Sequence, residues 1–217
     1  MVVGEKDAPR SQRRDATRER VLDAARQVFA ERGIFGATVE EICEAAGFTR
    51  GAFYSNFEDK ADVLEALIAR EHARLLAHLD ATLALAEGGG LALDVDTAPG
   101  LAAVVDQVLG SIPADRQLTL VMTELEIHAV RDPATSAAFK DADARFRSRI
   151  ASVIERGMSL AGRTLLADPG DVSDAAVSIV ARSVRRALLQ GGGADTDAMA
   201  RAILPLLLLG VSRPRQV

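Results

Sequence analysis

The chain offers few residues whose types and spacing would support catalysis or metal binding. Its three histidines, His72, His78 and His128, lack the i, i+4 histidine partner of a two-histidine metal site on a helix. Glu124, His128 and Asp132 do share one helical face, at i, i+4 and i+8. A metal or polar ligand could bind there, but side chains paired within the fold account for the spacing more simply. We therefore predict no metal ion and no cofactor.

Nucleophilic catalysis is also poorly supported. Residues 157–161 (GMSLA) begin like the nucleophile elbow of a hydrolase, but they end in Ala161 and lie within a helical pattern. Cys43 occupies the apolar stripe of a helix, which favours a buried thiol over a redox sensor. The sequence shows no strand-like alternation, so no glycine-rich phosphate loop follows a strand. We predict no catalytic residue and a protein that is not an enzyme.

A short polar stretch, residues 49–56 (TRGAFYSN), has chemistry suited to DNA instead. Only Ala52 and Phe53 could face a core, because the other side chains are polar or absent. An isolated helix of fewer than about 12 residues is marginal in water, so its neighbours must hold it in place. A helix-turn-helix does so when its second helix enters the DNA major groove. An ordinary helical hairpin on a protein surface has the same shape and stays an alternative.

The residues before this stretch predict a first helix and a turn. Thr38 and Glu41 have the spacing of a capping box, which opens a helix. The apolar stripe of that helix consists of Val39, Ile42, Cys43 and Ala46. Gly47 can adopt a positive φ and end the helix, and Thr49 suits the N-cap of the next one. We therefore expect a helix, a turn and a second helix over residues 38–56.

These residues and their flanks resemble the DNA-binding domain of the tetracycline-repressor (TetR) family. The matching positions are Val21–Phe29 (VLDAARQVF), Glu31–Gly33, Thr38–Ile42, Ala45–Gly47, Thr49–Tyr54, Phe57 and Lys60. Cys43 stands where the family usually has Ala, and Asp59 stands where it usually has Ser or Asn. Asp59 can still act as an N-cap, but its charge disfavours phosphate contacts at that corner.

The resemblance implies a role for the matched polar positions. The residues implied to face base edges are Thr49, Arg50, Gly51 and Ala52. Those implied to hold phosphates are Thr38, Tyr54, Asn56 and Lys60. The resemblance also implies an N-terminal three-helix domain and a C-terminal helical bundle that forms a dimer through its last two helices. This agrees with the all-α fold class that the helical periodicity predicts.

Three segments are expected in chain order. Residues 1–14 form a flexible basic arm, residues 15–60 the helix-turn-helix domain, and residues 61–217 the ligand-binding and dimerisation domain. Arg13 and Arg14 of the arm either reach the minor groove or lie in a solvated tail. The net charge is −5, and residues 1–60 hold ten Lys and Arg against eleven Asp and Glu. Local placement of charge, not its total, must therefore supply affinity for DNA.

Apolar periodicity predicts the remaining helices. The first is expected from Thr17 to Arg32, and a long one from Asp59 to Glu87 would span about 42 Å at 1.5 Å per residue. Later helices are expected over residues 101–110, 116–130, 134–160, 172–190 and 195–211. The last is apolar around most of its circumference, and the one before it has a face of small residues. We therefore expect them to pack against the same helices of a second copy.

A ligand pocket is expected between the helices of residues 116–130 and 134–160. The candidate lining residues are Met122, Leu125, Glu126, His128, Phe146 and Ile150. The first twenty residues lack the apolar centre of a secretory signal, and the run of residues 203–209 is too short to cross a bilayer. With a single cysteine, the chain is expected to be cytoplasmic and without a membrane partner.

These features predict a homodimeric, sequence-specific transcriptional regulator that binds double-stranded DNA at a palindromic operator. Two copies of the 49–56 helix would enter successive major grooves about 34 Å apart. We expect a repressor that a small apolar or amphipathic effector releases from its operator. The alternative is a DNA-bound architectural or scaffold protein that recruits a protein partner without a small-molecule effector.

Overall fold

The computed structural model describes residues 8–88, 98–110, 115–191 and 198–215, apart from the side chains of residues 8–11, 98–99 and 133–138. Its helices are α1 (Ala8–Arg32), α2 (Val39–Ala46), α3 (Arg50–Tyr54), α4 (Lys60–Glu87), α5 (Ala98–Gly110), α6 (Arg116–Arg131), α7 (Pro133–Leu160), α8 (Pro169–Leu189) and α9 (Ala198–Gly210). Two short strands, β1 (Arg163–Leu165) and β2 (Ser212–Pro214), complete the described secondary structure. The predicted all-α class and the N-terminal helix-turn-helix are confirmed.

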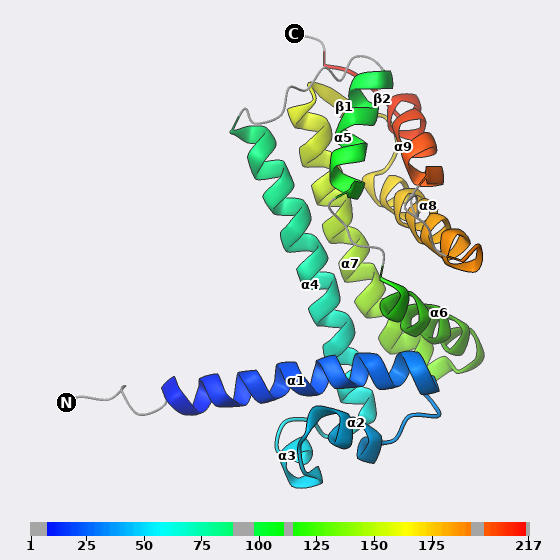
Figure 1. Ribbon diagram of the computed structural model, residues 1–217. Coiled ribbons are helices and arrows are strands. Elements are labelled where there is room, and N and C mark those ends of the chain that lie inside the picture. Colours follow the sequence, from blue (N-terminus) through cyan, green and yellow to red (C-terminus); the bar gives the residue numbers. More distant parts are fainter. Residues whose placement is uncertain (1–7, 89–97, 111–114, 192–197, 216–217) are drawn as a thin grey trace, which may run out of the picture.

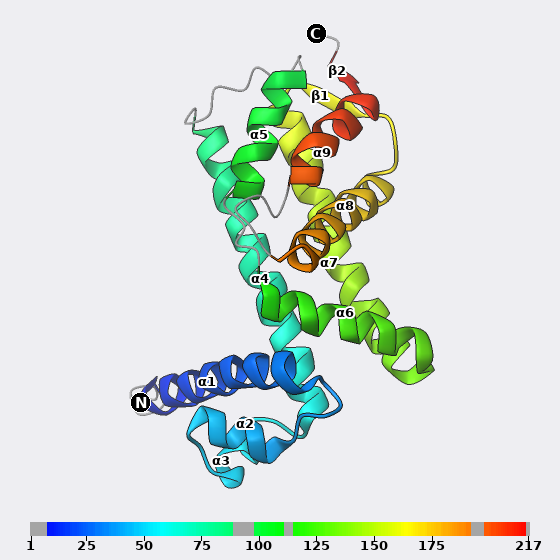
Figure 2. The same cartoon turned by 45° about the vertical axis from the view of Figure 1, so that its right-hand side comes forward.

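The long helix α4 joins two helical domains (Figures 1 and 2). At its start, α1 crosses it and α2 and α3 lie beside α1. Toward its end, α7 runs alongside it, and α5, α8 and α9 gather around α7. Helix α6 lies between the two groups and packs against α1 as well as α7. Both α4 and α6 therefore connect the helix-turn-helix to the second domain.

The N-terminal domain has a closed apolar core. The side chains of Phe29, Ile42 and Phe53 are at most 1% exposed. Helix α6 adds Val121 and Leu125 to this core, although α6 follows it in sequence by more than fifty residues. Packing of this kind holds α2 and α3 in place, because helices so short are not stable alone.

Local caps fix the ends of α2 and α3. Thr38 and Glu41 form both hydrogen bonds of a capping box, so the predicted start of α2 is confirmed. Gly47 ends α2 with a φ of 68°, a conformation that glycine adopts without steric cost. The Oγ1 of Thr49 accepts a hydrogen bond from the N–H of Ala52 at 3.3 Å and caps α3. Both helix boundaries follow from sequence-local chemistry.

Helix α1 begins earlier than its sequence pattern predicted. It starts at Ala8 rather than Thr17, so residues 8–14, expected to belong to a flexible arm, are helical. A formed helix extends at low cost through residues of adequate helix propensity, whether or not they carry an apolar stripe. The rest of the expected arm, residues 1–7, lies outside the described residues.

The prediction that the chain has no strand was wrong. Strands β1 and β2 pair antiparallel, with Thr164 opposite Arg213. The side chain of Arg163 donates to Ser212 Oγ at 2.9 Å and reinforces the pair. Three-residue strands are too short for alternating hydrophobicity to reveal them in the sequence.

The helices of the second domain were predicted in the correct order, with ends that differ by a few residues. Helix α5 begins at Ala98 instead of residue 101, and α8 begins at Pro169 instead of residue 172. Gly157 of α7 faces α4, and a Cβ at this position would meet the side chain of Leu83 at 3.4 Å. None of the described helices has both the length and the apolar character needed to cross a membrane.

Candidate nucleic-acid interface and ligand cavity

Helix α3 presents a polar face outward while its other face is anchored in the core. Thr49, Arg50 and Gly51 are exposed, and Tyr54 is 51% exposed, whereas Phe53 beneath them is fully buried. A Cβ at Gly51 would meet only the Oγ1 of Thr49, at 3.8 Å, so a partner molecule can approach the backbone closely here. This exposure is what a helix entering a DNA groove requires.

The guanidinium of Arg50 lies on this outward face. It is 2.8 Å from the carboxylate of Glu40 in α2 and 5.9 Å from the ring centroid of Tyr54. The pKa of Arg50 is raised, chiefly by a side-chain hydrogen bond with Tyr54 and next by the charge of Glu40. An arginine side chain can donate two hydrogen bonds to a guanine edge. Glu40 competes with DNA for those donors.

Three residues expected to hold phosphates have partners inside the protein. Lys60 Nζ donates to the carbonyl of Ala37 at 2.7 Å and so ties the start of α4 to the loop before α2. Asn56 Nδ2 donates to the carbonyl of Ala52 at 2.8 Å, and Thr38 caps α2. Lys60 and Asn56 are only half exposed. The roles of all three residues toward DNA stay predictions. Lys60 and Asn56 also have structural roles that the sequence pattern did not reveal.

Four arginines of α1 form two pairs that differ in their surroundings. Arg13 and Arg14 are exposed and line a groove beside α3. Arg18 instead donates to the carbonyl of Asn56 at 2.9 Å, and Arg20 donates to the last carbonyl of α2 at 2.9 Å. The first pair is placed to meet a phosphate backbone, whereas the second pair fastens α1 to the helix-turn-helix.

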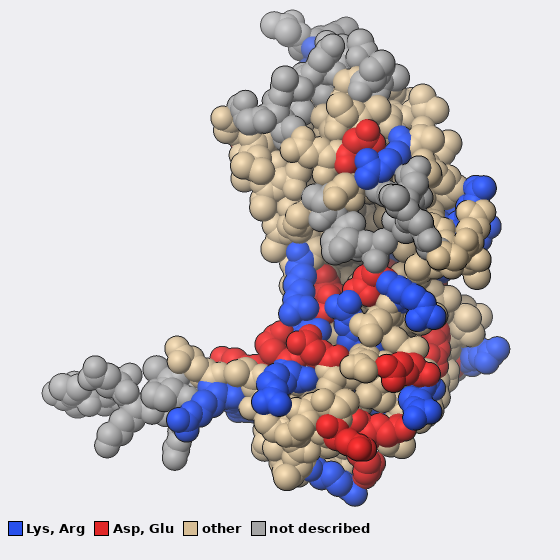
Figure 3. Space-filling view, in the orientation of Figure 1, with Lys and Arg blue, Asp and Glu red and all other residues tan. Residues whose placement is uncertain are grey.

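Acidic and basic side chains are intermixed on the N-terminal domain (Figure 3). This arrangement agrees with the near-zero charge balance of residues 1–60. Total charge therefore gives this domain no general attraction for DNA. Cys43 of α2 is buried, and burial raises the pKa of its thiol, which disfavours the reactive thiolate.

The second domain contains a cavity of about 420 Å³ lined by helices α4 to α9. Of the six lining residues expected from the sequence, the structure places four in its wall: Met122, Glu126, Phe146 and Ile150. The volume lies within the range of ordinary small-molecule sites, roughly 300–1,000 Å³. The helices expected to enclose the cavity do so, together with α4, α5, α8 and α9.

The other two expected lining residues, Leu125 and His128, lie on the opposite face of α6. Leu125 is 5% exposed and belongs to the core of the N-terminal domain. The imidazole of His128 contacts the ring of Phe35, with centroids 3.7 Å apart. The structure therefore does not place these two residues in the cavity wall: α6 is apolar on several sides, so hydrophobicity alone does not identify the face that meets the cavity.

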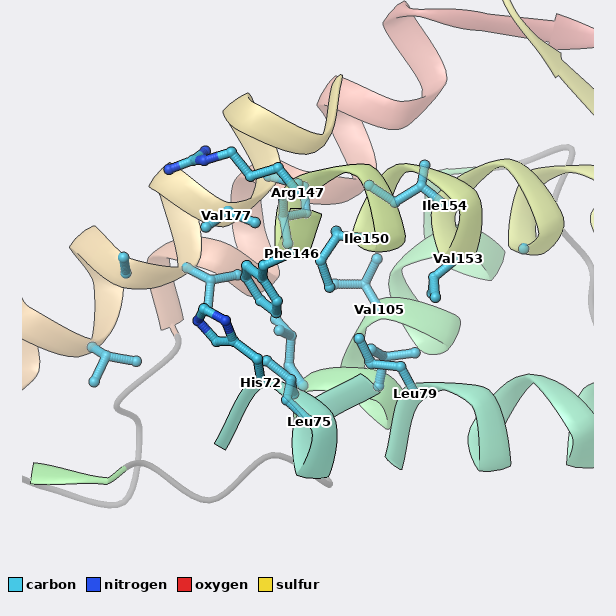
Figure 4. Close-up of a pocket in the computed structure, with 18 of the residues that line it drawn as sticks. His72, Leu75, Leu79, Val105, Phe146, Arg147, Ile150, Val153, Ile154 and Val177 are labelled. Carbon is cyan, nitrogen blue, oxygen red and sulfur yellow. The ribbon is translucent and has the colours of Figure 1, made fainter. Parts of the chain in front are cut away.

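Sequence reasoning missed a group of polar residues in the cavity wall (Figure 4). The imidazole of His72 stacks on the ring of Phe146, with centroids 4.0 Å apart and an interplanar angle of 16°. Arg147 donates to Asp143 at 2.6 Å and to Asp174 at 3.1 Å. These residues come from α4, α7 and α8, so no spacing within one helix could have grouped them.

Helix α6 meets the N-terminal domain through polar contacts as well as apolar ones. Its N-cap, Asp115, accepts a hydrogen bond from Leu118 N–H at 3.0 Å, forms an ion pair with Arg26 of α1, and also lines the cavity. Nine residues further along the chain, Glu124 accepts a hydrogen bond from the N–H of Ile34 at 2.9 Å. One helix therefore touches both the cavity and the domain that carries α3.

Fold and site together define a helix-turn-helix protein with a separate, cavity-containing helical domain. Residues 21–67 match the family described as "Bacterial regulatory proteins, tetR family". Over these residues, the chain is similar to the DNA-binding domain of this family of transcriptional regulators.

Two curated relatives match about a quarter of the chain. HTH-type transcriptional repressor BepR of Brucella suis is 54% identical over 54 residues, which cover 25% of this chain and 26% of BepR. HTH-type transcriptional regulator SrpR of Pseudomonas putida is 46% identical over 59 residues, covering 27% and 28% of the two chains. The matched stretch thus spans about a quarter of these relatives' length.

Solved structures resemble the whole fold. SmeT, the repressor of the Stenotrophomonas maltophilia multidrug efflux pump SmeDEF, is 26% identical with a TM-score of 0.58, over 90% of each chain. The fatty acid degradation regulator FadR of Bacillus halodurans has a TM-score of 0.68 at 22% identity, over 89% of this chain and 95% of FadR. The second likeness concerns the fold alone.

Proposed function

We propose that the protein is a dimeric repressor that binds a palindromic operator and leaves it when a small molecule occupies the cavity of the second domain. The observation that carries the proposal is the position of α6. Its Met122 and Glu126 line the cavity, while its Val121 and Leu125 pack into the core that supports α3. A ligand that displaces α6 would therefore move the domain that carries α3.

The contacts of α6 supply a physical route for this coupling. Asp115 lines the cavity and also forms an ion pair with Arg26 of α1, so this one residue contacts both the cavity and the N-terminal domain. Release from DNA requires the ligand to favour the non-binding arrangement by its differential affinity. A 100-fold preference corresponds to about 2.7 kcal/mol, a typical size for coupling between sites. Repositioning of one well-packed helix is sufficient to change that much packing energy.

Dimerisation is supported by apolar surface on α8 and α9. Leu189 at the end of α8 is 84% exposed, and Ile203 and Leu206 of α9 are 43% and 60% exposed. Apolar side chains grouped on neighbouring helices favour an interface between copies. A dimer would also supply the two recognition helices that a palindromic operator requires. The expected cytoplasmic location stays a prediction.

The cavity favours this function over that of an architectural scaffold. A scaffold that needs no effector would have no use for a cavity of about 420 Å³ beside its coupling helix. SmeT, the relative in fold at 26% identity, has a structure described as a triclosan complex. We extend ligand binding to this chain on the strength of its own cavity, with that complex as support.

Selection of bound sequences from random duplex DNA tests the proposal. We expect enrichment of a palindrome whose half-site centres are about one helical turn apart, the spacing of two recognition helices in successive major grooves. The test variant is Arg50→Ala. It removes a side chain exposed on α3 and should lower the enrichment. Enrichment of a single non-repeated site, or none, would contradict operator binding by a dimer.

A further inference from the structure

The cavity wall is divided into a polar end and an apolar end. Near α6 it includes His72, Thr123, Glu126 and Arg147, whereas toward α5 and α9 the lining is aliphatic. The aliphatic lining includes Leu79, Leu83, Leu101, Val105, Ile154, Leu204 and Leu208. In Figure 4 the nitrogens of His72 and Arg147 lie toward one end, and Leu79, Val105 and Val153 lie toward the other. A ligand that fills this space must itself have one polar end.

Charged groups at the polar end are already paired with one another. Arg147 lies between Asp143 and Asp174, at 2.6 and 3.1 Å. Burial opposes the charge of Arg147, but hydrogen bonds and charges from these two acids raise its pKa overall. Arg185 is 2.9 Å from Glu126, completing a second pair. A charged ligand head would have to compete with one of these partly exposed pairs.

The third acid at this end, Asp115, is also paired, with Arg26 of α1. Among the described cavity residues, each arginine therefore has a carboxylate and each carboxylate has an arginine. An anionic head finds no arginine without a carboxylate, and an ammonium head would have to compete with an arginine for any of these carboxylates. Burial of a charged head without a counter-charge costs several kcal/mol.

His72 is the polar side chain best placed to meet an uncharged head. Its ring is held by the stack on Phe146, and its nitrogens make no hydrogen bond within the described part of the chain. Burial lowers the pKa of His72, opposed by Asp143, so the neutral form predominates at pH 7. Neutral imidazole offers one donor and one acceptor, which suits a hydroxyl or carbonyl group.

We propose that the cavity binds an uncharged lipophilic molecule whose hydroxyl or carbonyl head hydrogen-bonds to His72 and whose apolar body lies against α5 and α9. The inference rests on the proposed ligand-binding function and specifies its ligand class. From His72 to Leu83 the lining follows α4 for eleven residues, about 16 Å at 1.5 Å per residue. A ten-carbon chain fits that path, so decyl compounds are suitable probes.

Binding of 1-decanol, decanoate and decylammonium to the full chain at pH 7.5 tests the head-group assignment, because the three probes share one tail. Calorimetry or displacement of an environment-sensitive dye would measure the three affinities. We expect 1-decanol to bind at least about 10-fold more tightly than either ion, because only the ions lose the hydration of a charge and compete with the arginine–carboxylate pairs. Tighter binding of decanoate or decylammonium would overturn the proposal.

Substitution of His72 tests its role directly. His72→Phe preserves an aromatic ring against Phe146 but removes the nitrogens, and should weaken 1-decanol binding about 3- to 10-fold, the weight of one net hydrogen bond. His72→Gln retains a donor and an acceptor and should lose less. The matched control is His78→Phe, an exposed position on the same helix outside the cavity, with no expected change. Equal losses in the Phe and Gln variants would assign His72 a packing role only and contradict the proposal.

The outcomes separate this inference from the proposed function. If the decyl compounds bind in another order, the head-group class is wrong while ligand binding stands. If none of the three binds and none changes affinity for a selected operator, the ligand-responsive part of the proposed function fails together with the inference. If all three bind equally and the His72 variants are unchanged, the cavity selects on the apolar body alone and the inference is overturned.

Discussion

The two domains differ in how they use their apolar residues. The N-terminal domain buries Phe29, Ile42 and Phe53 almost completely in a closed core, and its polar groups lie at caps and on the outer face of α3. The second domain arranges a comparable set of apolar side chains around a cavity of about 420 Å³. The closed core gives α3 a rigid support, whereas the cavity of the second domain leaves room for a ligand.

Helix α6 contributes side chains both to the closed core and to the cavity wall. Its Val121 and Leu125 complete the closed core, and its Met122 and Glu126 face the cavity. Closely packed interiors transmit displacement because their side chains have few alternative positions. The cavity can thus change shape at a modest cost, while the N-terminal core must follow α6 as a unit.

The largest expected effect is on stability. Removal of a buried aromatic ring should cost more in the closed N-terminal core than in the cavity wall. Phe53→Ala removes a fully buried ring from the closed core and should lower the free energy of unfolding by about 3–5 kcal/mol. Phe146→Ala should cost less, because that ring already borders empty space. Chemical denaturation of both variants measures the two costs. Equal costs would show that the cavity wall is as tightly packed as the N-terminal core.

Loss of the exposed cation on α3 should affect DNA binding and not stability. Arg50→Ala should weaken operator binding by about 1–3 kcal/mol and relax base preference at one position of the half-site, if Arg50 reads a guanine. Arg149→Ala is the matched control, because that side chain is 65% exposed, like Arg50 at 62%, but lies in the second domain. Binding curves on selected and altered operators compare the two variants. Unchanged affinity and selectivity in Arg50→Ala would refute its assigned role.

Removal of the charge at the start of α6 should weaken communication between the domains. Asp115→Asn retains an N-cap residue but loses the ion pair with Arg26, so the coupling between ligand and operator should fall by about 1–2 kcal/mol. Ligand affinity measured without DNA should change less than the coupling does. Asp106→Asn is the control, since Asp106 pairs with Arg201 away from the N-terminal domain. Full ligand-induced release in Asp115→Asn would exclude this pair from the coupling.

Glu40 should limit the affinity of α3 for DNA. Glu40→Gln frees Arg50 from its carboxylate partner and removes a negative charge near the phosphates, so operator binding should tighten by roughly 0.5–1 kcal/mol. The slope of affinity against salt concentration provides a second reading, because freed cations release more counter-ions from DNA. Weaker binding of Glu40→Gln would show that Glu40 positions Arg50 instead of competing for it.

The smallest expected effect is a pH dependence of stability due to His72. Burial lowers its pKa in the folded protein below the ordinary value of 6.5, so the unfolded chain takes up a proton first as pH falls. Stability should therefore decline as the pH falls below about 6.5, the ordinary pKa of histidine. Melting temperatures at pH 7.5 and 5.5 measure the decline. His72→Phe should reduce it and His78→Phe should not; the same decline in both variants would assign it to other groups.

Features that depend on residues close together in the sequence could be predicted, whereas features that depend on distant residues could not. The capping box at Thr38, the positive φ of Gly47 and the N-cap at Thr49 involve neighbours within a few residues, and each was predicted correctly. The choice of cavity face on α6 was not, because Leu125 and His128 are apolar or aromatic like the true lining residues.

Interactions between distant segments were beyond such reasoning. The stack of His72 on Phe146 joins α4 to α7, and the pair of Arg26 with Asp115 joins α1 to α6. The position of Lys60 in the motif predicts a phosphate contact, but its Nζ donates a hydrogen bond to the carbonyl of Ala37. Patterns within one helix show which faces are apolar or charged, but only the packed fold decides which partner each face meets.

Reciprocal coupling tests the central claim most directly. If α6 links the cavity to α3, the factor by which a ligand weakens operator binding must equal the factor by which the operator weakens ligand binding. The measurement is the affinity of the tightest decyl compound for the protein alone and for the protein saturated with selected operator DNA. We predict weaker binding to the DNA complex, by the same factor as the ligand's effect on operator affinity. Equal ligand affinity with and without operator would contradict the account.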